Sequence, residues 1–132
     1  MQETLDISTD SEVQVLDVTD QVERSIPNSV TEGLCSVFVP HTTAGVTINE
    51  AESNLVADIE SIMAALVPAG EGYRHDRIDD NADAHLRSIL CGSSVSIPVL
   101  DGSLDLGTWQ SILVFEGDGP RRRQLRVTVI ES

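Results

Sequence analysis

The two ends of the chain share an alternation of apolar and polar side chains that limits the folds open to it. Near the N-terminus Leu5 and Ile7 alternate with polar residues, and near the C-terminus Leu125, Val127 and Val129 do the same. A two-residue period puts successive side chains on opposite faces of an extended strand. Both ends are therefore predicted to be half-buried β-strands, and the fold has to cover one face of each.

Further strands are predicted between the two ends. Residues 13–15 alternate in the same way, and residues 33–40 are apolar on both faces, which is typical of an interior strand. An apolar run at residues 111–116 is followed by a glycine-rich turn at residues 117–119. We expect this turn to join residues 111–116 to the C-terminal strand in a last hairpin.

A second hairpin is predicted just before that run. Residues 95–99 alternate, and Pro98 indicates an edge strand or a bulge because proline cannot donate to a strand ladder. Asp101 and Gly102 then form a strong signal for a tight turn. Leu104 and Leu106 are expected to continue into the returning strand.

Helical periodicity is confined to the first two-thirds of the chain. A short helix is predicted within residues 17–28, capped by Thr19 or Asp20 and ended with the help of Pro27. Apolar residues at three- and four-residue spacing predict the clearest helix at about residues 52–66. A helix at about residues 80–90 is expected to pack through Ala82, Leu86, Ile89 and Leu90.

These elements predict one domain over residues 1–132, long enough to close a single core. The predicted class is α+β, mainly an antiparallel two-sheet β-sandwich with two or three short helices inserted in the first two-thirds. No internal repeat or low-complexity linker divides the chain.

The charge of the chain excludes some partners. Its 22 Asp and Glu oppose eight Arg and no Lys, for a formal net charge of -14. Nucleic acids and anionic membranes are not expected as general partners, because they are bound through Lys and Arg. We interpret the acidity as a halophilic adaptation to high salt, which screens repulsion at the surface.

The two cysteines lie within apolar stretches. Cys35 and Cys91 are expected to be buried free thiols, and no signal-like N-terminus or long apolar span is present. Together these features favour a reduced, cytoplasmic setting.

A cluster of arginines is the strongest chemical signal. Residues 107–110 contain the only Trp, and residues 116–123 place Glu116 and three consecutive arginines, Arg121 to Arg123, around one turn. The planar donor fork of Arg suits phosphate or carboxylate, so the cluster indicates an anion site. The alternative is a solvated hairpin end whose charges are neutralised by nearby acids.

The three histidines are a second candidate site. His41, His75 and His85 all fall in loops or at a helix start, and three convergent imidazoles could bind a transition metal. Residues 41–50 are rich in small and hydroxylated side chains, and we expect their backbone N–H groups to form an anion-binding nest. Asn81 and His85 are four residues apart and so lie on one side of a helix. Taken singly, each histidine is more often structural or solvent-exposed. The spacing alone does not make a metal site, since no HxH or HxxxH pair is present.

Several common sites are absent. The chain has no GxGxxG, no GxxxxGK[ST], no GxSxG and no paired-aromatic platform. Nucleotide-binding, serine-hydrolase and RNA-binding functions therefore have little support.

A family resemblance rests on four ordered motifs: Pro40-His41-Thr42-Thr43-Ala44-Gly45-Val46-Thr47-Ile48-Asn49-Glu50, His75-Asp76 with Asn81-Ala82-Asp83-Ala84-His85-Leu86, Gly107-Thr108-Trp109-Gln110, and Glu116-Gly117-Asp118-Gly119-Pro120-Arg121. With these motifs the chain resembles the YjbQ family over nearly its whole length. Members of that family are small trimeric α+β proteins with a β-sandwich core, described as secondary thiamine-phosphate synthases on the strength of a weak activity. The resemblance differs at residues 78–81, where the family often has a more glycine-containing, glutamate-bearing turn.

The resemblance implies a transferase that joins a hydroxymethylpyrimidine diphosphate to a thiazole phosphate and releases pyrophosphate. It implies leaving-group stabilisation by Arg121 and Arg123, a catalytic or Arg-orienting role for Glu116, and a ring-stacking wall at Trp109. The residues expected to bind a divalent zinc or magnesium ion, or the phosphate itself, are His41, His75 and His85, with His41 also a catalytic candidate. The remaining substrate-binding candidates are Thr42, Thr43, Asn49 and Asn81.

Two functions remain open from the sequence. One is the synthase-like transferase, and the other is an accessory protein that holds a metal or a phosphometabolite without physiological catalysis. Both would need the same anion site. The resemblance implies a homotrimer in either case. The arginines are expected to face a neighbouring subunit, because ligand sites of small subunits often lie at interfaces.

Overall fold

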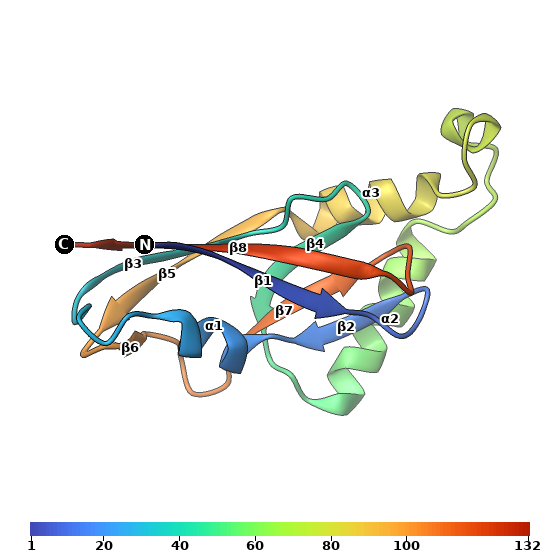
Figure 1. Cartoon of the computed structure of the whole chain (residues 1–132). Helices are drawn as coiled ribbons and strands as arrows, with labels where there is room; N and C mark the ends of the chain where they lie inside the picture. The colour runs from blue at the N-terminus through green and yellow to red at the C-terminus, as the bar shows by residue number, and fades with distance from the viewer.

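The structure is a computed structural model that describes residues 1–132, and it consists of two antiparallel sheets with three α-helices (Figure 1). The five-stranded sheet has the order β1 (Gln2–Ser8), β8 (Arg122–Glu131), β3 (Gly33–Phe38), β5 (Ser94–Leu100), β6 (Ser103–Leu104). The three-stranded sheet has the order β2 (Gln14–Asp17), β7 (Ser111–Glu116), β4 (Ala44–Asn49). The helices are α1 (Thr19–Ser25), α2 (Ser53–Leu66) and α3 (Ala82–Cys91), with a 3₁₀ turn, η1 (Arg74–Arg77), before α3. The predicted α+β two-sheet class and the placement of the helices are confirmed.

The core lies between the two sheets. The inward-facing side chains of the terminal strands are buried, namely Ile7 on β1 and Leu125, Val127 and Val129 on β8. They pack with the inward side chains of the three-stranded sheet, such as Ile112. The alternation at the two ends of the sequence therefore marks half-buried strands, as predicted. These two strands also pair with each other (Figure 1).

The predicted last hairpin is wrong. β7 pairs with β2 and β4 in the three-stranded sheet, whereas β8 pairs with β1 and β3 in the other sheet. Residues 117–121 therefore carry the chain across the edge of the sandwich from one sheet to the other. Local pattern could not distinguish a hairpin turn from a crossover, because both need a short glycine-rich connection.

Residues 44–49 form a strand that sequence reasoning did not predict. β4 pairs with β7 from Ala44 opposite Glu116 to Asn49 opposite Ser111. The expected anion-binding nest is wrong over this stretch, because a paired β-strand does not gather its N–H groups around a ligand. Gly45 is needed here, because a Cβ atom would come within 2.5 Å of the carbonyl oxygen of Gly92.

The strand β3 is interior in its sheet, as predicted, since β8 and β5 flank it. Only one of its faces is buried, however. Leu34 and Phe38 point to the outer face of the five-stranded sheet and are 44% and 40% exposed. No helix of this chain covers that face.

The α2 helix is confirmed almost to the residue, and the carboxylate of Glu52 caps it by accepting from the N–H groups of Asn54 and Leu55. The α3 helix is also confirmed, but its predicted packing face is wrong. Leu86 and Ile89 are exposed, at 38% and 76%. The exposed set also includes Leu90.

The buried face of α3 is instead small or charged. Of the predicted packing residues only Ala82 is buried, and it is joined by Asp83, Ala84, Arg87 and Ser88. Arg87 forms an ion pair with Asp83 and donates from Nε to the carbonyl oxygen of Val67 at 2.9 Å. These contacts hold the end of α2 against α3.

Smaller predictions are resolved by hydrogen bonds. The α1 helix is capped by neither Thr19 nor Asp20, because its N-cap residue is Val18, which makes no side-chain cap bond. Asp17 accepts from both the N–H and the hydroxyl of Thr19. Asp101 and Gly102 form the tight turn of the β5–β6 hairpin, both with positive φ. Pro98 lies where β6 is too short to pair with β5, which agrees with the predicted edge position.

Cys35 is buried and Cys91 partly buried, and both are free thiols as predicted. Burial raises the pKa of each thiol to about 11. None of the helices combines the length and the apolarity that crossing a membrane requires.

Candidate functional site

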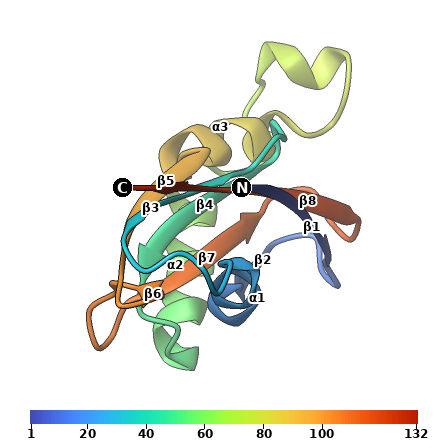
Figure 2. The ribbon, with the colours of Figure 1, turned by 60° about the vertical axis from the view of Figure 1, so that its left-hand side comes forward.

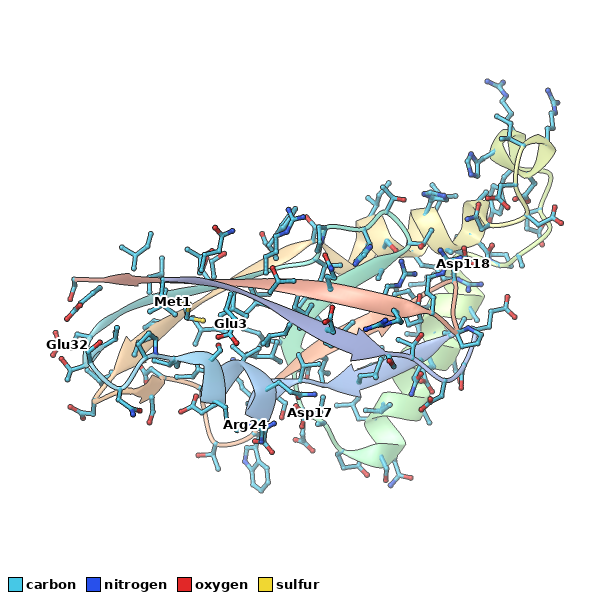
Figure 3. The ribbon with its side chains drawn as sticks, in the orientation of Figure 1. Met1, Glu3, Asp17, Arg24, Glu32 and Asp118 are labelled. Carbon is cyan, nitrogen blue, oxygen red and sulfur yellow. The ribbon has the colours of Figure 1, made fainter.

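The site is built at one end of the sandwich, where residues 117–121 cross between the sheets. Asp118 marks this end in Figure 3, and Glu32 marks the opposite end of the molecule. The start of α3 and the η1 turn reach the same end, and η1 projects beyond the sheets (Figure 2). Segments far apart in sequence therefore meet around one loop.

An ion pair closed to water lies beneath the loop. Arg123 donates from Nε to Glu116 Oε1 at 2.8 Å and from Nη2 to Glu116 Oε2. Two neighbouring groups also donate to the Glu116 carboxylate. Thr9 donates from Oγ1 to Oε1 at 2.9 Å, and the backbone N–H of Asp118 donates to Oε2 at 3.0 Å. Arg123 also donates from Nη2 to the hydroxyl oxygen of Thr43 at 2.8 Å. Both carboxylate oxygens of Glu116 are thus fully engaged.

The protonation of Glu116 follows from these contacts. Burial alone would raise its pKa, but the hydrogen bonds from Arg123, Asp118 and Thr9 outweigh burial and hold the pKa below its ordinary value. Glu116 is therefore a carboxylate at neutral pH, and its side chain has no exposed surface. It orients Arg123 and does not line the cavity above the pair.

An open cavity of about 540 Å³ lies above the ion pair. The candidate residues along its wall are His41, Thr42, Thr43, Arg121 and Arg123. Arg121 is the one arginine among them with substantial exposure, since 51% of its side chain meets solvent. Asp118 holds this arginine through its carbonyl oxygen and its carboxylate, at 2.8 and 3.1 Å. The cavity thus presents a fixed guanidinium to solvent.

His41 stands at the wall of this cavity and is tied to β8. Its Nε2 accepts a hydrogen bond from the backbone N–H of Gln124 at 2.9 Å. Burial, followed by the charge of Arg123, lowers the pKa of His41 below its ordinary value of 6.5. The ring is therefore neutral at pH 7.

A second cavity, of about 360 Å³, adjoins the first. His41, Thr42 and Ser93 line both cavities, and His85 lines the second. Two backbone hydrogen bonds connect the segments on either side of His41 to the end of α3. The N–H of Val39 donates to the carbonyl oxygen of Ser93, and the N–H of Val46 donates to that of Gly92. The C-terminal end of α3 is thereby fixed beside His41.

His75, His85 and Asn81 form a chain that leads back to the loop. The rings of His75 and His85 meet edge to face, with centroids 4.6 Å apart. His75 Nε2 lies 3.0 Å from Asn81 Oδ1, and Asn81 donates from Nδ2 to Asp118 Oδ2 at 3.0 Å. Asp118 therefore connects the histidine pair to Arg121.

Two candidates lie elsewhere. Asn49 ends β4 at the opposite end from the loop, five residues or about 16 Å along the strand from Ala44. Trp109 lies beside it, 74% exposed, in a cavity of about 200 Å³. The chain therefore does not bring Asn49 and Trp109 to the arginine cavity.

The predicted three-histidine metal site does not fit the geometry. No group of three or more His, Cys, Asp or Glu side chains is arranged to hold a metal ion. His75 and His85 are adjacent, but the Nε2 lone pair of His41 is already used by Gln124. We therefore derive no chemical step through a metal.

Sequence reasoning missed three contributors to the site. Asp118 positions Arg121 and Asn81, Thr9 bonds to both Glu116 and the loop backbone, and Ser93 lines both cavities. Asp118 stood within the quoted glycine-rich turn and could have been chosen. Nothing in the local sequence around Thr9 or Ser93 indicated their positions.

Fold and site together define a class: a two-sheet α+β sandwich with an arginine–histidine cavity at the crossover between its sheets. The UPF0047 protein YjbQ-like family model matches residues 3–132. The chain belongs to this family.

Its relatives and structural neighbours agree. The chain is 50% identical over 126 residues to a UPF0047 protein of Archaeoglobus fulgidus, covering 96% of this chain and 98% of that one. It is 46% identical to a UPF0047 protein of Methanothermobacter thermautotrophicus, with 95% and 88% covered. A crystal structure of a hypothetical protein from Aeropyrum pernix K1 superposes with a TM-score of 0.96 at 41% identity, covering 100% of this chain and 99% of that one.

Proposed function

We propose that the chain binds a phosphorylated metabolite in the cavity beside Arg121 and acts as a secondary thiamine-phosphate synthase-like transferase. The observation that carries the proposal is the exposed guanidinium of Arg121, which Asp118 holds at the wall of an open cavity. A fixed Arg fork matches the oxygens of a phosphate or diphosphate. Arg121 is the one exposed cation at this cavity wall, in a chain of net charge -14.

The reaction places modest demands on the protein. The C–O bond between the pyrimidine methylene and the diphosphate breaks, and its electron pair leaves with pyrophosphate. The thiazole nitrogen lone pair forms the new C–N bond, so no proton has to be removed from the nucleophile. The main requirement is stabilisation of the leaving diphosphate, which preorganised donors supply.

The proposed roles follow from exposure. Arg121 contacts the diphosphate, and Thr42, exposed on the same wall, offers a hydroxyl. Arg123 and Glu116 act from beneath as positioning residues, because both are closed to water. Asn81 contacts His75 through Oδ1 and is itself held by Asp118, so it positions the histidine pair.

A second candidate function is an accessory protein that holds a phosphometabolite without catalysis. The complete engagement of Glu116 favours it, because the carboxylate expected to act as acid or base has no access to a ligand. The two functions share the anion site and differ only in turnover.

We also propose a homotrimer. The support is the uncovered outer face of the five-stranded sheet, where the apolar side chains include Leu34, Phe38, Leu100 and Ile130. The solution mass at molar salt, measured by light scattering, tests it. A monomer under those conditions would refute the trimer.

The test of function uses purified protein with the two thiamine-phosphate precursors at molar salt, with and without added zinc or magnesium. Formation of thiamine phosphate that is lost in Arg121→Ala supports the transferase. Retained binding of pyrophosphate by the wild type, with no product, supports the accessory protein. Arg122→Ala is the matched control, because Arg122 is exposed on β8 but does not line the cavity.

A further inference from the structure

One hydrogen bond fixes the tautomer of His41. The backbone N–H of Gln124 points at Nε2 from 2.9 Å, and a backbone N–H can only donate. Nε2 must therefore present its lone pair and carry no hydrogen. A neutral imidazole has a single N–H, so the hydrogen of His41 is on Nδ1.

The Nδ1 atom is free to reach a ligand. No hydrogen bond within the chain engages it, yet no buried side-chain nitrogen or oxygen lacks a partner. Nδ1 is therefore accessible to solvent. His41 lines both adjoining cavities, so a ligand that enters them lies beside its ring.

We infer that His41 donates a hydrogen bond from its neutral Nδ1–H to a phosphoryl oxygen bound beside Arg121, and that it is not a metal ligand. The inference rests on the proposed anion-binding function. It assigns to His41 a role that differs from the metal role expected from the sequence.

Neither ring nitrogen of His41 has a lone pair free for a metal ion. Coordination through Nε2 would break the bond from Gln124 and leave that backbone N–H without its partner. Coordination through Nδ1 would require removal of its hydrogen, which leaves an imidazolate. The neighbouring Arg123 further favours a neutral ring over a cationic one, so His41 remains a neutral donor that adds direction rather than charge.

Two amide substitutions separate the ring nitrogens. In His41→Asn the amide nitrogen can occupy the place of Nδ1, so the donor is kept and the tie to Gln124 is lost. In His41→Gln the amide oxygen can replace Nε2 and keep that tie, but no donor stands at the Nδ1 position. His41→Ala removes both.

The experiment is calorimetric titration of each variant with inorganic pyrophosphate. We expect His41→Asn to bind within about threefold of the wild type, and the Gln and Ala variants to bind at least about tenfold more weakly, as for loss of a hydrogen bond to a charged group. An Asn variant as weak as the Ala variant would overturn the inference. If the wild type itself does not bind pyrophosphate, the proposed function fails, and the donor role falls with it.

Nitrogen-15 NMR of labelled histidine tests the tautomer in the wild type, so the result does not depend on whether a variant folds. We expect a protonated Nδ1 and an unprotonated Nε2 for His41, with shifts that zinc does not change. Zinc affinity should be equal in the wild type and in His41→Ala. A protonated Nε2, or a loss of zinc affinity in His41→Ala, would contradict the inference.

Discussion

The guanidinium of Arg123 and the carboxylate of Glu116 form an ion pair that is shielded from water, with 4% and 0% of their side chains exposed. Arg123 is the second residue of the C-terminal strand β8, whereas Glu116 ends β7 in the other sheet. The pair therefore joins the two sheets at the point where the chain crosses between them. It also fixes the floor of the cavity beside Arg121 and His41.

Loss of Arg123 should destabilise the fold strongly. Arg123→Met leaves Glu116 as a buried carboxylate without its cation, and removal of one partner of a buried pair costs about 3–5 kcal/mol. Urea denaturation measures the free energy of unfolding. Arg122→Met, at the exposed neighbouring position, should change it little.

The ion pair should also control stability in acid. The pKa of Glu116 is held below its ordinary value of 4.5, so the unfolded chain binds the proton more readily than the folded one. The stabilisation is complete above pH 4.5 and is lost as the pH falls through the lower, folded pKa. Denaturation between pH 7 and pH 3 should show a flatter loss of stability in Glu116→Gln than in the wild type. Glu3→Gln, at an exposed position of β1, controls for the loss of one charge, and equal slopes in all three proteins would refute the prediction.

A methyl group at Gly45 should disturb both stability and the site. The added Cβ would lie 2.5 Å from the carbonyl oxygen of Gly92 and 2.9 Å from the Cβ of Cys91. Overpacking of this kind costs about 1–3 kcal/mol. Gly45→Ala should lower the melting temperature and weaken pyrophosphate binding, because it pushes α3 and His85 away from His41. Gly107→Ala, where the new Cβ meets only the Gln110 side chain, is the control, and it should melt like the wild type.

Salt should stabilise the protein. The 22 acidic residues repel one another in the folded state, and most of the carboxylates are exposed. Salt screens this repulsion, so the melting temperature should rise from low to molar sodium chloride. A melting temperature that is constant or falls over this range would refute the halophilic interpretation.

The sequence predicted the elements well where side-chain periodicity was strong. The helix at Ser53–Leu66 and the alternating strands at both ends lie where the pattern placed them. Periodicity failed for α3, because its apolar residues Leu86 and Ile89 are exposed while Arg87 is buried. The Asp83 carboxylate and the Val67 carbonyl allow that burial, and Val67 is distant in sequence.

The candidate site was predicted in part. The sequence marked Arg121, His41 and His85, which the structure gathers around two adjoining cavities. It grouped Trp109 with them, although that residue lies at the far end of β7. Residues that belong to one set of family motifs need not be close in space, because a six-residue strand can place its two ends about 16 Å apart.

The sequence by itself determined the helices, the strands other than β4, the two-sheet class and the residue types available for anion binding, because these follow from local periodicity and side-chain chemistry. Only the tertiary structure decided that residues 117–121 cross between sheets, that Glu116 is sealed beneath Arg123, and that the lone pair of His41 is taken by Gln124. Each of these depends on how strands from distant parts of the chain pack. A hydrogen bond between residues 83 positions apart leaves no trace in the sequence around either one.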